Sequence, residues 1–368
     1  MRVRLEEVCK RIYAGGDVPK DRYSEVMTEE YSVPIYANAE KDNGLYGYTD
    51  KAREEELSIT VAARGTIGFT AIRREPFFPV VRLITVVPDI EKVSERYLYY
   101  VLKNCKPQSS GTSIPQLTIP DIKKNSLELY SISKQESIAN QLDKVNRVIE
   151  LRKQELNSLD CIIKARFVEM FGDLRMNTKG WSVKTFDKLS YLITDGEHST
   201  PRRIAEGVYL LSARNILNHS LQLEDVDYID KEEYDRIAKR VVPQEGDVLI
   251  SCSGTVGRCC SAPADVKFQM VRSVALIRFK EDINHVFAEY MITSDYLQEQ
   301  IKGSQTVSAQ ANLFQGKIKA LKGFVPPIEL QNQFADFVRQ VDKSKVAVQK
   351  ALDVTQMLFD SLMQKYFM

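Results

Sequence analysis

Residues 133–171 read SKQESIANQLDKVNRVIELRKQELNSLDCIIKARFVEMF, the most regular stretch of this 368-residue chain. Its apolar residues alternate at spacings of four and three, which is the pattern of a coiled-coil seam. Ser133 and Glu136 have the spacing of a capping box at the beginning of a helix. The sequence therefore predicts one long helix over residues 131–172. Its predicted interface with a partner helix is Ile138, Leu142, Val145, Ile149, Leu156, Leu159 and Ile163.

The same seam returns 196 residues further on, where position 334 matches position 138. Pro326-Pro327 marks the beginning of this second helix, because proline fits the first helical turn, and we predict the helix over residues 327–368. Its predicted interface is Phe334, Val338, Val341, Val348, Leu352, Phe359 and Leu362. A narrow apolar stripe needs a partner, so we expect the two helices to pair with each other as an antiparallel coiled coil. Packing of each helix on its own domain or on a neighbouring chain is the other interpretation.

A short turn is duplicated as well, as Gly65-Thr66-Ile67-Gly68 and Gly254-Thr255-Val256-Gly257. Each copy follows a β-branched, strand-like run, and its two glycines permit a tight chain reversal. The strand-like runs are residues 57–62, 78–81, 83–87, 247–251 and 273–277. We therefore expect an α+β fold with a pseudo-two-fold internal repeat. It consists of two mixed α/β domains, at residues 1–130 and 173–326, separated by the two long helices at residues 131–172 and 327–368.

The chain is nearly neutral, with 51 basic and 50 acidic residues. A basic domain is the usual footprint of a nucleic-acid-binding protein, so any such role must depend on positive charge clustered on one face. No apolar run has the roughly 20 residues that span a bilayer, and we expect no membrane association. The six cysteines show no CxxC spacing, which favours a reduced, cytoplasmic protein with free thiols.

The sequence lacks the motifs of common catalysts. It contains neither the GxxxxGK[ST] phosphate loop nor GxGxxG, and its three histidines show no metal-ligand spacing with cysteines or carboxylates. Residues 88–92 superficially resemble a nuclease carboxylate set, but the second half has no match, and we interpret them as a strand-terminating turn. We therefore predict no catalytic residue, no metal and no cofactor in this chain.

Polar loops near the duplicated turn supply the candidate DNA-binding residues. Arginine and lysine can contact phosphates or guanine edges, and asparagine can read adenine. In the first half the candidates are Lys41, Asn43, Arg64, Thr66, Arg73 and Arg74. In the second half they are His198, Thr200, Arg202, Arg203, Arg214, Asn215, Ser253, Thr255, Arg258, Lys267 and Arg272. Taken singly each could be a solvated surface residue; as a cluster repeated in both halves they indicate a binding face.

In its order of globular region, long helix, globular region and long helix, the chain resembles a specificity subunit of a type I restriction-modification enzyme. The resemblance covers nearly the whole chain and depends on the alternation of a globular region and a spacer helix, present twice. It also depends on four sequence stretches in the second half. They are Asp195-Gly196-Glu197-His198-Ser199-Thr200-Pro201, Leu211-Ser212-Ala213-Arg214-Asn215-Ile216, residues 246–257 and Val325-Pro326-Pro327-Ile328-Glu329-Leu330-Gln331.

The resemblance implies that each globular region is a target-recognition domain reading one half of a bipartite, asymmetric sequence in double-stranded DNA. The helices would set the spacing between the half-sites and dock two DNA methyltransferase subunits, which nuclease-translocase subunits join. Those partners would use S-adenosylmethionine, ATP and Mg, and this chain would be non-catalytic. The first half departs from the pattern, because residues 11–19 lack a full counterpart of the Asp-Gly-x-His loop.

Two other functions compete with this interpretation. A coiled-coil adaptor with two globular heads that bind proteins or structured RNA would suit the neutral charge. A stand-alone nuclease is disfavoured by the lack of an ordered set of carboxylates and lysine.

Overall fold

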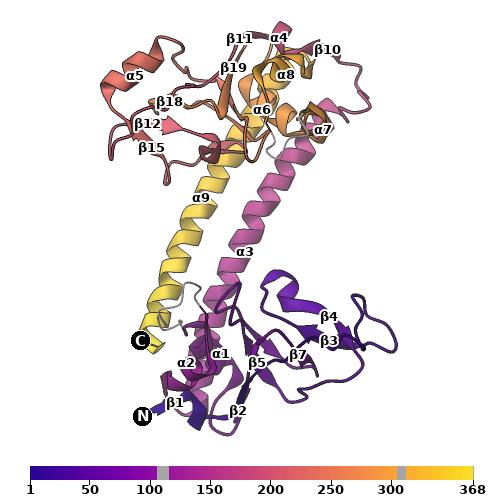
Figure 1. The fold of residues 1–368 in the computed structure, drawn as a ribbon, viewed down its shortest axis with the longest axis vertical. Coiled ribbons are helices and arrows are strands. Elements are labelled where there is room, and N and C mark those ends of the chain that lie inside the picture. Colours follow the sequence, from indigo (N-terminus) through magenta and orange to yellow (C-terminus); the bar gives the residue numbers. More distant parts are fainter. Residues whose placement is uncertain (106–115, 305–311, 368) are drawn as a thin grey trace. The chain divides into compact units, whose positions relative to one another are not determined.

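The computed structural model describes residues 1–105, 116–304 and 312–367. The chain forms two compact units: unit 1 contains Met1–Gln154 and the chain from Gln349, and unit 2 contains Glu155–Val348. Each unit holds one mixed α/β domain and part of both long helices, α3 (Ile132–Phe171) and α9 (Ile328–Phe367) (Figure 1). The helices and the duplicated mixed domains confirm the predicted fold class. The predicted domain boundaries stay predictions, because the two units divide inside both helices.

Unit 1 is built on two small sheets. The four-stranded sheet is antiparallel, in the order β2 (Cys9–Ala14), β8 (Ile84–Pro88), β5 (Ser58–Val61) and β6 (Thr70–Arg73). The three-stranded sheet has the order β4 (Leu45–Thr49), β3 (Val33–Tyr36) and β7 (Phe78–Pro79), with β3 and β7 parallel. The remaining elements are β1 (Arg2–Arg4), β9 (Ser126–Glu128), α1 (Glu95–Lys103), α2 (Ile119–Lys124) and the 3-10 turns η1 (Leu5–Glu7) and η2 (Lys41–Gly44).

Unit 2 repeats both sheets with the same strand order. Its four-stranded sheet is β11 (Ser190–Asp195), β19 (Val274–Phe279), β16 (Val248–Ser251) and β17 (Cys259–Ser261). Its three-stranded sheet is β15 (Asp227–Ile229), β12 (Val208–Leu211) and β18 (Phe268–Met270), with β12 and β18 parallel. The other strands are β10 (Ser182–Thr185), β13 (Ile216–Leu217), β14 (Ser220–Leu221) and β20 (Lys322–Val325). The other helices are α4 (Phe186–Leu189), α5 (Lys231–Ala238), α6 (His285–Thr293), α7 (Asp295–Ser304), α8 (Gln315–Ala320) and the 3-10 turn η3 (Ala213–Asn215).

The two long helices pack antiparallel along the predicted seam in both units. In unit 1, Ile138, Leu142 and Ile149 of α3 share one apolar core with Phe359 of α9, and the Tyr366 hydroxyl donates to Gln141 Oε1 at 3.1 Å. In unit 2, the apolar core joins residues 163–171 of α3 to residues 334–341 of α9. Every predicted interface residue of both helices is buried or half-buried. This burial is consistent with a seam at spacings of four and three, which keeps one stripe of each helix against its partner, and the residue-by-residue interface stays a prediction.

The predicted beginning of the second helix is correct, and the predicted cap of the first is wrong. Helix α9 begins at Ile328, directly after the two prolines. Helix α3 begins at Ile132, so its capping side chain is Ser131, whose Oγ accepts from the Lys134 N–H at 3.4 Å. Glu136 does not close a capping box with Ser133; its carboxylate contacts Ser94 and Arg96 of the domain instead.

A buried glutamine fastens each long helix to its own domain. Gln135 Oε1 accepts from the Ser94 N–H at 2.9 Å, and Gln331 Oε1 accepts from the Asn284 N–H at 2.9 Å. Ser94 and Asn284 precede α1 and α6 respectively. The glutamine amide groups donate to the carbonyls of Lys92 and Tyr130 in unit 1 and of Asp282 and Pro326 in unit 2. Both glutamines are fully buried, so these bonds satisfy main-chain groups that water does not reach.

Candidate nucleic-acid interface

In unit 2, four loops meet at one end of the four-stranded sheet. Strands β11 and β16 both run antiparallel to β19, so the loops that follow them lie beside the loop that precedes β19. Hydrogen bonds join them. Gly196 N donates to Val274 O at 2.9 Å and Cys252 N to Ser273 O at 2.8 Å, both between main-chain atoms, and Ala213 N donates to the side-chain Oγ of Ser273 at 3.0 Å. We call this set of loops the second rim. It consists of residues 196–203, 212–215, 252–258 and 271–273.

Unit 1 has an equivalent set, the first rim. It consists of residues 15–17, 37–44, 62–69 and 80–83. Asn38 joins three of these loops, because its amide contacts Val81 O and its Oδ1 accepts from Ala63 N–H at 2.8 Å. Gly15 N donates to Leu83 O at 2.8 Å, in the manner of Gly196 in the second rim. Each domain therefore presents one rim of polar loops, built on the same sheet topology.

The duplicated Gly-Thr-x-Gly turn closes a hairpin in each rim, between β5 and β6 in unit 1 and between β16 and β17 in unit 2. Gly65 and Gly254 have φ of +66° and +69°, in the left-handed region that favours glycine. Thr66 and Thr255 are exposed at the two tips. The predicted turns are correct. The strands β6 and β17 that complete the hairpins were not predicted, because they have only four and three residues and show too little alternation of apolar and polar residues to indicate a strand.

A close approach of main chain explains a second pair of glycines. A Cβ on Gly196 would lie 2.3 Å from Met270 O, and one on Gly15 would lie 2.6 Å from Pro79 O. Gly15 follows β2 and Gly196 follows β11, the first strands of the two four-stranded sheets. Each glycine lies against the parallel-paired strand of the three-stranded sheet, which is β7 in unit 1 and β18 in unit 2. Gly15 is thus the counterpart of Gly196, although the residues after it differ. The first half retains the glycine of the Asp-Gly-x-His loop without its histidine.

Carboxylates accompany most arginines in the second rim. Asp227 pairs with Arg203 at 2.9 Å and with Arg214 at 3.1 Å, and Arg202 pairs with Asp230. His198 Nε2 lies 2.7 Å from Asp195 Oδ2. The hydrogen bond from Ser199 lowers the pKa of Glu197 in the same loop. Exposed ion pairs of this kind contribute about 0–1 kcal/mol, so a phosphate could exchange with the carboxylate.

The other rim candidates are less neutralised. Within the described part of the chain, Lys41, Arg258 and Arg272 have no ion-pair partner. Arg64 donates to Gln116 Oε1 through Nε at 3.2 Å and Nη2 at 3.0 Å, which leaves its charge uncompensated. Asn43, Thr66, Thr200 and Thr255 are exposed, and Ser253 is half-buried.

The sequence matches the family model described as the type I restriction modification DNA specificity domain, over residues 1–160 and 203–354. The chain belongs to this family. A specificity subunit of Mycoplasma pneumoniae is 34% identical over 165 residues, which are 42% of this chain and 49% of that protein. The specificity subunit of a type I restriction enzyme of Methanocaldococcus jannaschii is 22% identical over 96% of this chain and 86% of its own length. The match thus spans about half of the more similar relative.

A solved structure shows the same fold. The type I restriction-modification S subunit from M. genitalium superposes with a TM-score of 0.58 at 15% identity, covering all of this chain and 96% of that one. Membership of this family favours the DNA-specificity interpretation over the adaptor.

Two of the predicted DNA-contacting residues, Arg73 and Asn215, are buried and do not reach the surface of a rim. The Arg73 guanidinium is stacked 3.6 Å from the centre of the Tyr36 ring, with Nε donating to Thr60 Oγ1 at 3.1 Å and Nη2 to Asn43 O at 2.7 Å. This burial lowers the pKa of Arg73. Asn215 is fully buried and bonds the main chain of its own loop. Both side chains hold the rims together from inside.

Two further candidates lie at the opposite end of the sheets. Arg74 follows β6, which runs away from the Gly-Thr-Ile-Gly turn, and it pairs with Glu95 at 3.0 Å. Lys267 precedes β18, and its Nζ lies 4.1 Å from the centre of the Tyr234 ring. Proximity in sequence misled the prediction here, since one short strand separates each residue from the rim. The prediction also missed Arg82, an exposed member of the first rim.

A further polar cluster lies inside unit 2, around His219. Among the described residues, no group of three or more His, Cys, Asp or Glu side chains could hold a metal ion. His219 Nδ1 lies 3.0 Å from Glu289 Oε2 inside unit 2, where it stacks on Tyr290. In the same part of the chain, no helix is long and apolar enough to cross a membrane.

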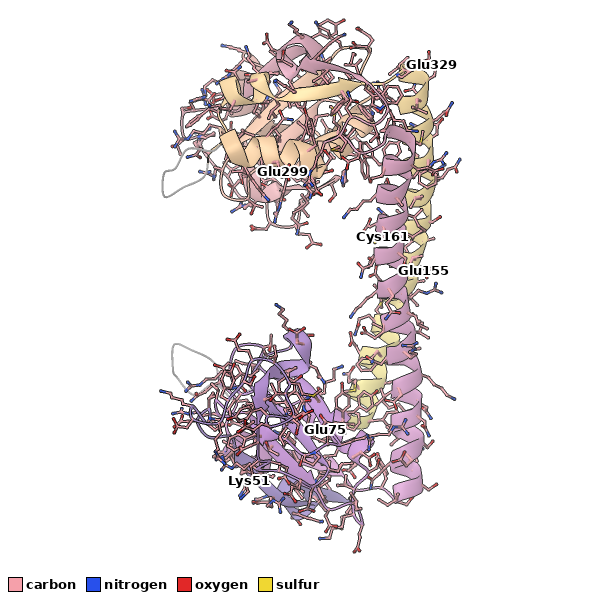
Figure 2. All side chains as sticks on the ribbon, turned by 90° about the vertical axis from the view of Figure 1, so that its right-hand side faces the viewer. Lys51, Glu75, Glu155, Cys161, Glu299 and Glu329 are labelled. Carbon is pink, nitrogen blue, oxygen red and sulfur yellow. The ribbon has the colours of Figure 1, made fainter. Side chains whose placement is uncertain are left out.

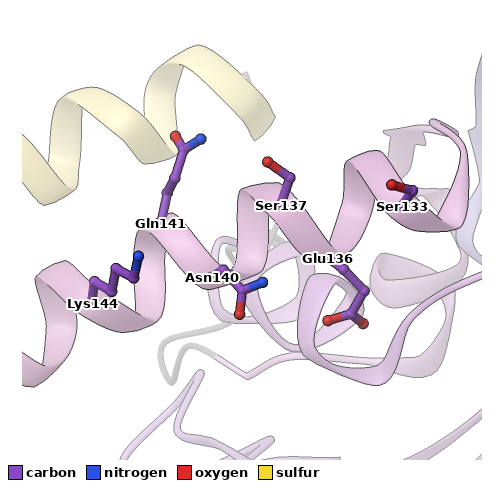
Figure 3. A pocket seen from close by; sticks show the side chains of 6 residues that line it. All are labelled: Ser133, Glu136, Ser137, Asn140, Gln141 and Lys144. Atoms are coloured by element: carbon purple, nitrogen blue, oxygen red, sulfur yellow. The ribbon is translucent and has the colours of Figure 1, made fainter.

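A polar hollow of about 490 Å³ lies along the first turns of α3 (Figure 3). Its lining is Ser133, Glu136, Ser137, Asn140, Gln141 and Lys144. All of these residues come from one helix, and Gln141 extends toward α9, where it meets Tyr366. The hollow therefore reflects the packing of the helix ends in unit 1.

Proposed function

We propose that this chain is the DNA-specificity subunit of a type I restriction-modification complex, and that each rim contacts one half of a bipartite, asymmetric target in double-stranded DNA. One observation carries the proposal. A chain of this family presents a polar rim at the same place on two domains of the same topology. The rims carry different side chains, and unlike readers suit unlike half-sites. Phosphate contacts would position each domain, and base contacts would specify the sequence.

The chemistry of restriction and modification would belong to other subunits. We infer two DNA methyltransferase subunits that use S-adenosylmethionine, and nuclease-translocase subunits that use ATP and Mg. The sequence supports this division because it lacks a nucleotide-binding loop and a catalytic motif. A relative's name, the specificity subunit of a type I restriction enzyme, agrees with it. Acting on cellular DNA, the complex would be cytoplasmic.

The long helices would set the half-site spacing and carry the methyltransferase subunits. Each helix has 40 residues, which corresponds to about 60 Å. In unit 1 the helices expose apolar side chains outside their seam: Val148 and Leu151 on α3, and Val354, Met357 and Leu358 on α9. In unit 2, Glu155 and Cys161 lie exposed on α3 (Figure 2). Exposed apolar residues grouped on a helix pair are typical of a protein-protein contact.

Methylation mapping tests the function. The chain is expressed with its methyltransferase partners in a host without other adenine methylation, and the genome is sequenced for methylated adenine. We expect one motif of two unlike half-sequences separated by an unspecified spacer. Absence of a methylated motif, together with no salt-dependent binding of duplex DNA by the assembled complex, would favour the adaptor.

The two domains are assigned to their half-sites by variants of one rim at a time. Arg258→Ala removes an uncompensated charge from the second rim, so methylation of sites with a mismatch in one half-sequence should fall selectively. Thr66→Ala in the first rim is the counterpart and should affect the other half. Equal sensitivity of both half-sequences to Arg258→Ala would contradict the assignment.

A further inference from the structure

The turn before β8 in unit 1 and the turn before β19 in unit 2 occupy equivalent places in the two rims. Val81 N donates to Gly16 O at 2.8 Å, and Arg272 N donates to Glu197 O at 2.9 Å. The accepting residue in each case directly follows the matched glycine of its loop. These hydrogen bonds align Val81 with Arg272, and both side chains are exposed. At the same point, the first rim therefore presents an apolar side chain and the second rim a charged one.

The backbone of the first turn is unfavourable for the residues that it carries. Leu83 N donates to Val80 O at 3.0 Å, and the two residues between them, Val81 and Arg82, have φ of 52° and 62°. A turn with positive φ at both central residues favours asparagine and glycine, and a β-branched residue is rare in this left-handed region. In the equivalent turn of unit 2, residues 272–273 have no positive φ. The strain is therefore particular to the first rim.

Hydrogen bonds from two loops hold Val81 in this conformation. Its N–H donates to Gly16 O, and the Asn38 amide contacts its carbonyl oxygen. Strained backbone that the surrounding structure maintains is typical of functional sites. Val81 is 49% exposed, and it is the one exposed large apolar side chain among the residues of the first rim, all of which the structure describes. Packing of the domain does not explain an exposed valine at a strained position, which points to an external contact.

We propose that Val81 reads a thymine in the first half-site, through an apolar contact with the C5-methyl group of that base. This inference rests on the proposed DNA-binding function and assigns a base contact within it. A valine side chain can neither donate nor accept a hydrogen bond, so it has nothing to offer a phosphate. The thymine methyl is the apolar group that base edges present in the major groove. Arg272, at the same point of the second rim, has the opposite chemistry, which suits two half-sites of different sequence.

The test removes the two apolar groups separately and together. The full-length chain, assembled with its methyltransferase subunits, is titrated with duplexes of its mapped target in which deoxyuridine replaces one thymidine at a time, so that only the methyl group is lost. The variants are Val81→Gly and Val81→Asn, because both residues tolerate the left-handed backbone. Ile90→Asn is the matched control, since it removes an exposed β-branched side chain two residues beyond the other end of β8.

For the wild-type complex, one of these replacements in the first half-sequence should weaken binding about fourfold, as expected when one apolar methyl group is no longer buried. Both Val81 variants should bind the unmodified target more weakly and should not distinguish it from the duplex with that uracil. Their binding to a duplex of unrelated sequence should be unchanged, and Ile90→Asn should keep the wild-type preference for thymine. Hydrogen exchange of the β8 amides should be slower in Val81→Asn, because asparagine adopts the left-handed backbone more readily.

A wild-type complex without any thymine preference in the first half-sequence, or a preference that both Val81 variants retain, would overturn the inference while leaving the proposed function intact. So would a loss of preference confined to the second half-sequence, or faster exchange of the β8 amides in both variants. Failure of both variants to assemble with the methyltransferase subunits would also overturn it, because it would indicate a protein contact at Val81. If the wild-type complex binds neither its target nor the unrelated duplex, the proposed function fails and the inference with it.

Discussion

Gln135 and Gln331 each join three segments of main chain with one buried side chain. Each occupies the same place in its long helix and satisfies an N–H and two carbonyls of its own domain. Arg73 has a similar internal role in unit 1, where it bonds Thr60 and Asn43 and stacks on Tyr36. Such residues decide how a domain sits on its helix and how a rim is supported, without contacting a ligand.

Replacing Gln331 with methionine should destabilise unit 2. The substitution keeps the volume but leaves the Asn284 N–H and two carbonyls unsatisfied, at a cost of about 1–3 kcal/mol for a buried donor. The only tryptophan of the chain, Trp181, packs on the unit 2 core, so its fluorescence in a urea titration reports this unit. Gln333→Met, on the exposed side of the same helix, is the control. Equal midpoints for the two variants would contradict the buried role of Gln331.

Arg73→Lys should destabilise unit 1 without changing DNA binding. Lysine cannot reproduce the stacked, forked contacts of the guanidinium, and we expect a loss of about 1–3 kcal/mol, read as faster hydrogen exchange of the β5 amides. Arg74→Lys, beside it in an exposed ion pair, should exchange like the wild type. A reduced slope of log DNA affinity against log salt, with normal hydrogen exchange of the β5 amides, would instead indicate that Arg73 contacts DNA.

Among the elements, the two long helices were the most predictable and the short strands the least. Each long helix has 40 residues, and an apolar pattern that keeps its period over this length predicts both the helix and the face that it buries. Strands of two to six residues give little periodicity, and their pairing depends on residues far away in sequence. Strands β6 and β17 were missed for this reason, and with them the position of Arg74 and Lys267 relative to the rims.

Neighbouring isoleucines on α3 test the seam. Ile163 is 1% exposed in the unit 2 core, while Ile162 is 48% exposed. Ile163→Ala should cost about 2–5 kcal/mol because it leaves a cavity in the core. Ile162→Ala should change stability by less than about 0.5 kcal/mol, since alanine is a good helix former. Trp181 fluorescence in urea compares them. Similar losses from both would mean that α3 buries a broader face than its seam.

At the scale of the whole molecule, the scaffold is duplicated and its two rims differ. This combination connects the structure to the proposed function. Two domains share strand orders β2-β8-β5-β6 and β11-β19-β16-β17, and each is attached to both long helices through equivalent contacts. The rims have diverged around a common glycine, Gly15 and Gly196, and the duplicated Gly-Thr-x-Gly turn. A duplicated frame with unlike rims is what an asymmetric, two-part DNA target would require.

Lengthening both helices tests their proposed role in spacing. Inserting seven residues between Gln154 and Glu155 and seven between Val348 and Gln349, where the units divide, preserves the seam because the heptad is its repeat. The added length is about 10 Å, or about three base pairs of B-DNA at 3.4 Å each. Methylation mapping should show both half-sequences unchanged and the spacer longer. An unchanged spacer in a stable variant would show that the helices do not set it.

The local pattern of residues was enough to determine the helices, the hairpin turns and the duplication, because the helices and the turns each depend on neighbours close in sequence and the duplication is a repeat of such patterns. The tertiary structure decided which polar residues share a rim. Arg73 and Asn215 look like surface residues in sequence, but the folded domains bury both. Arg82 stands alone in sequence, but antiparallel pairing brings it to the rim beside Gly15. A loop's surroundings depend on strand order, and strand order depends on contacts between residues far apart in the chain.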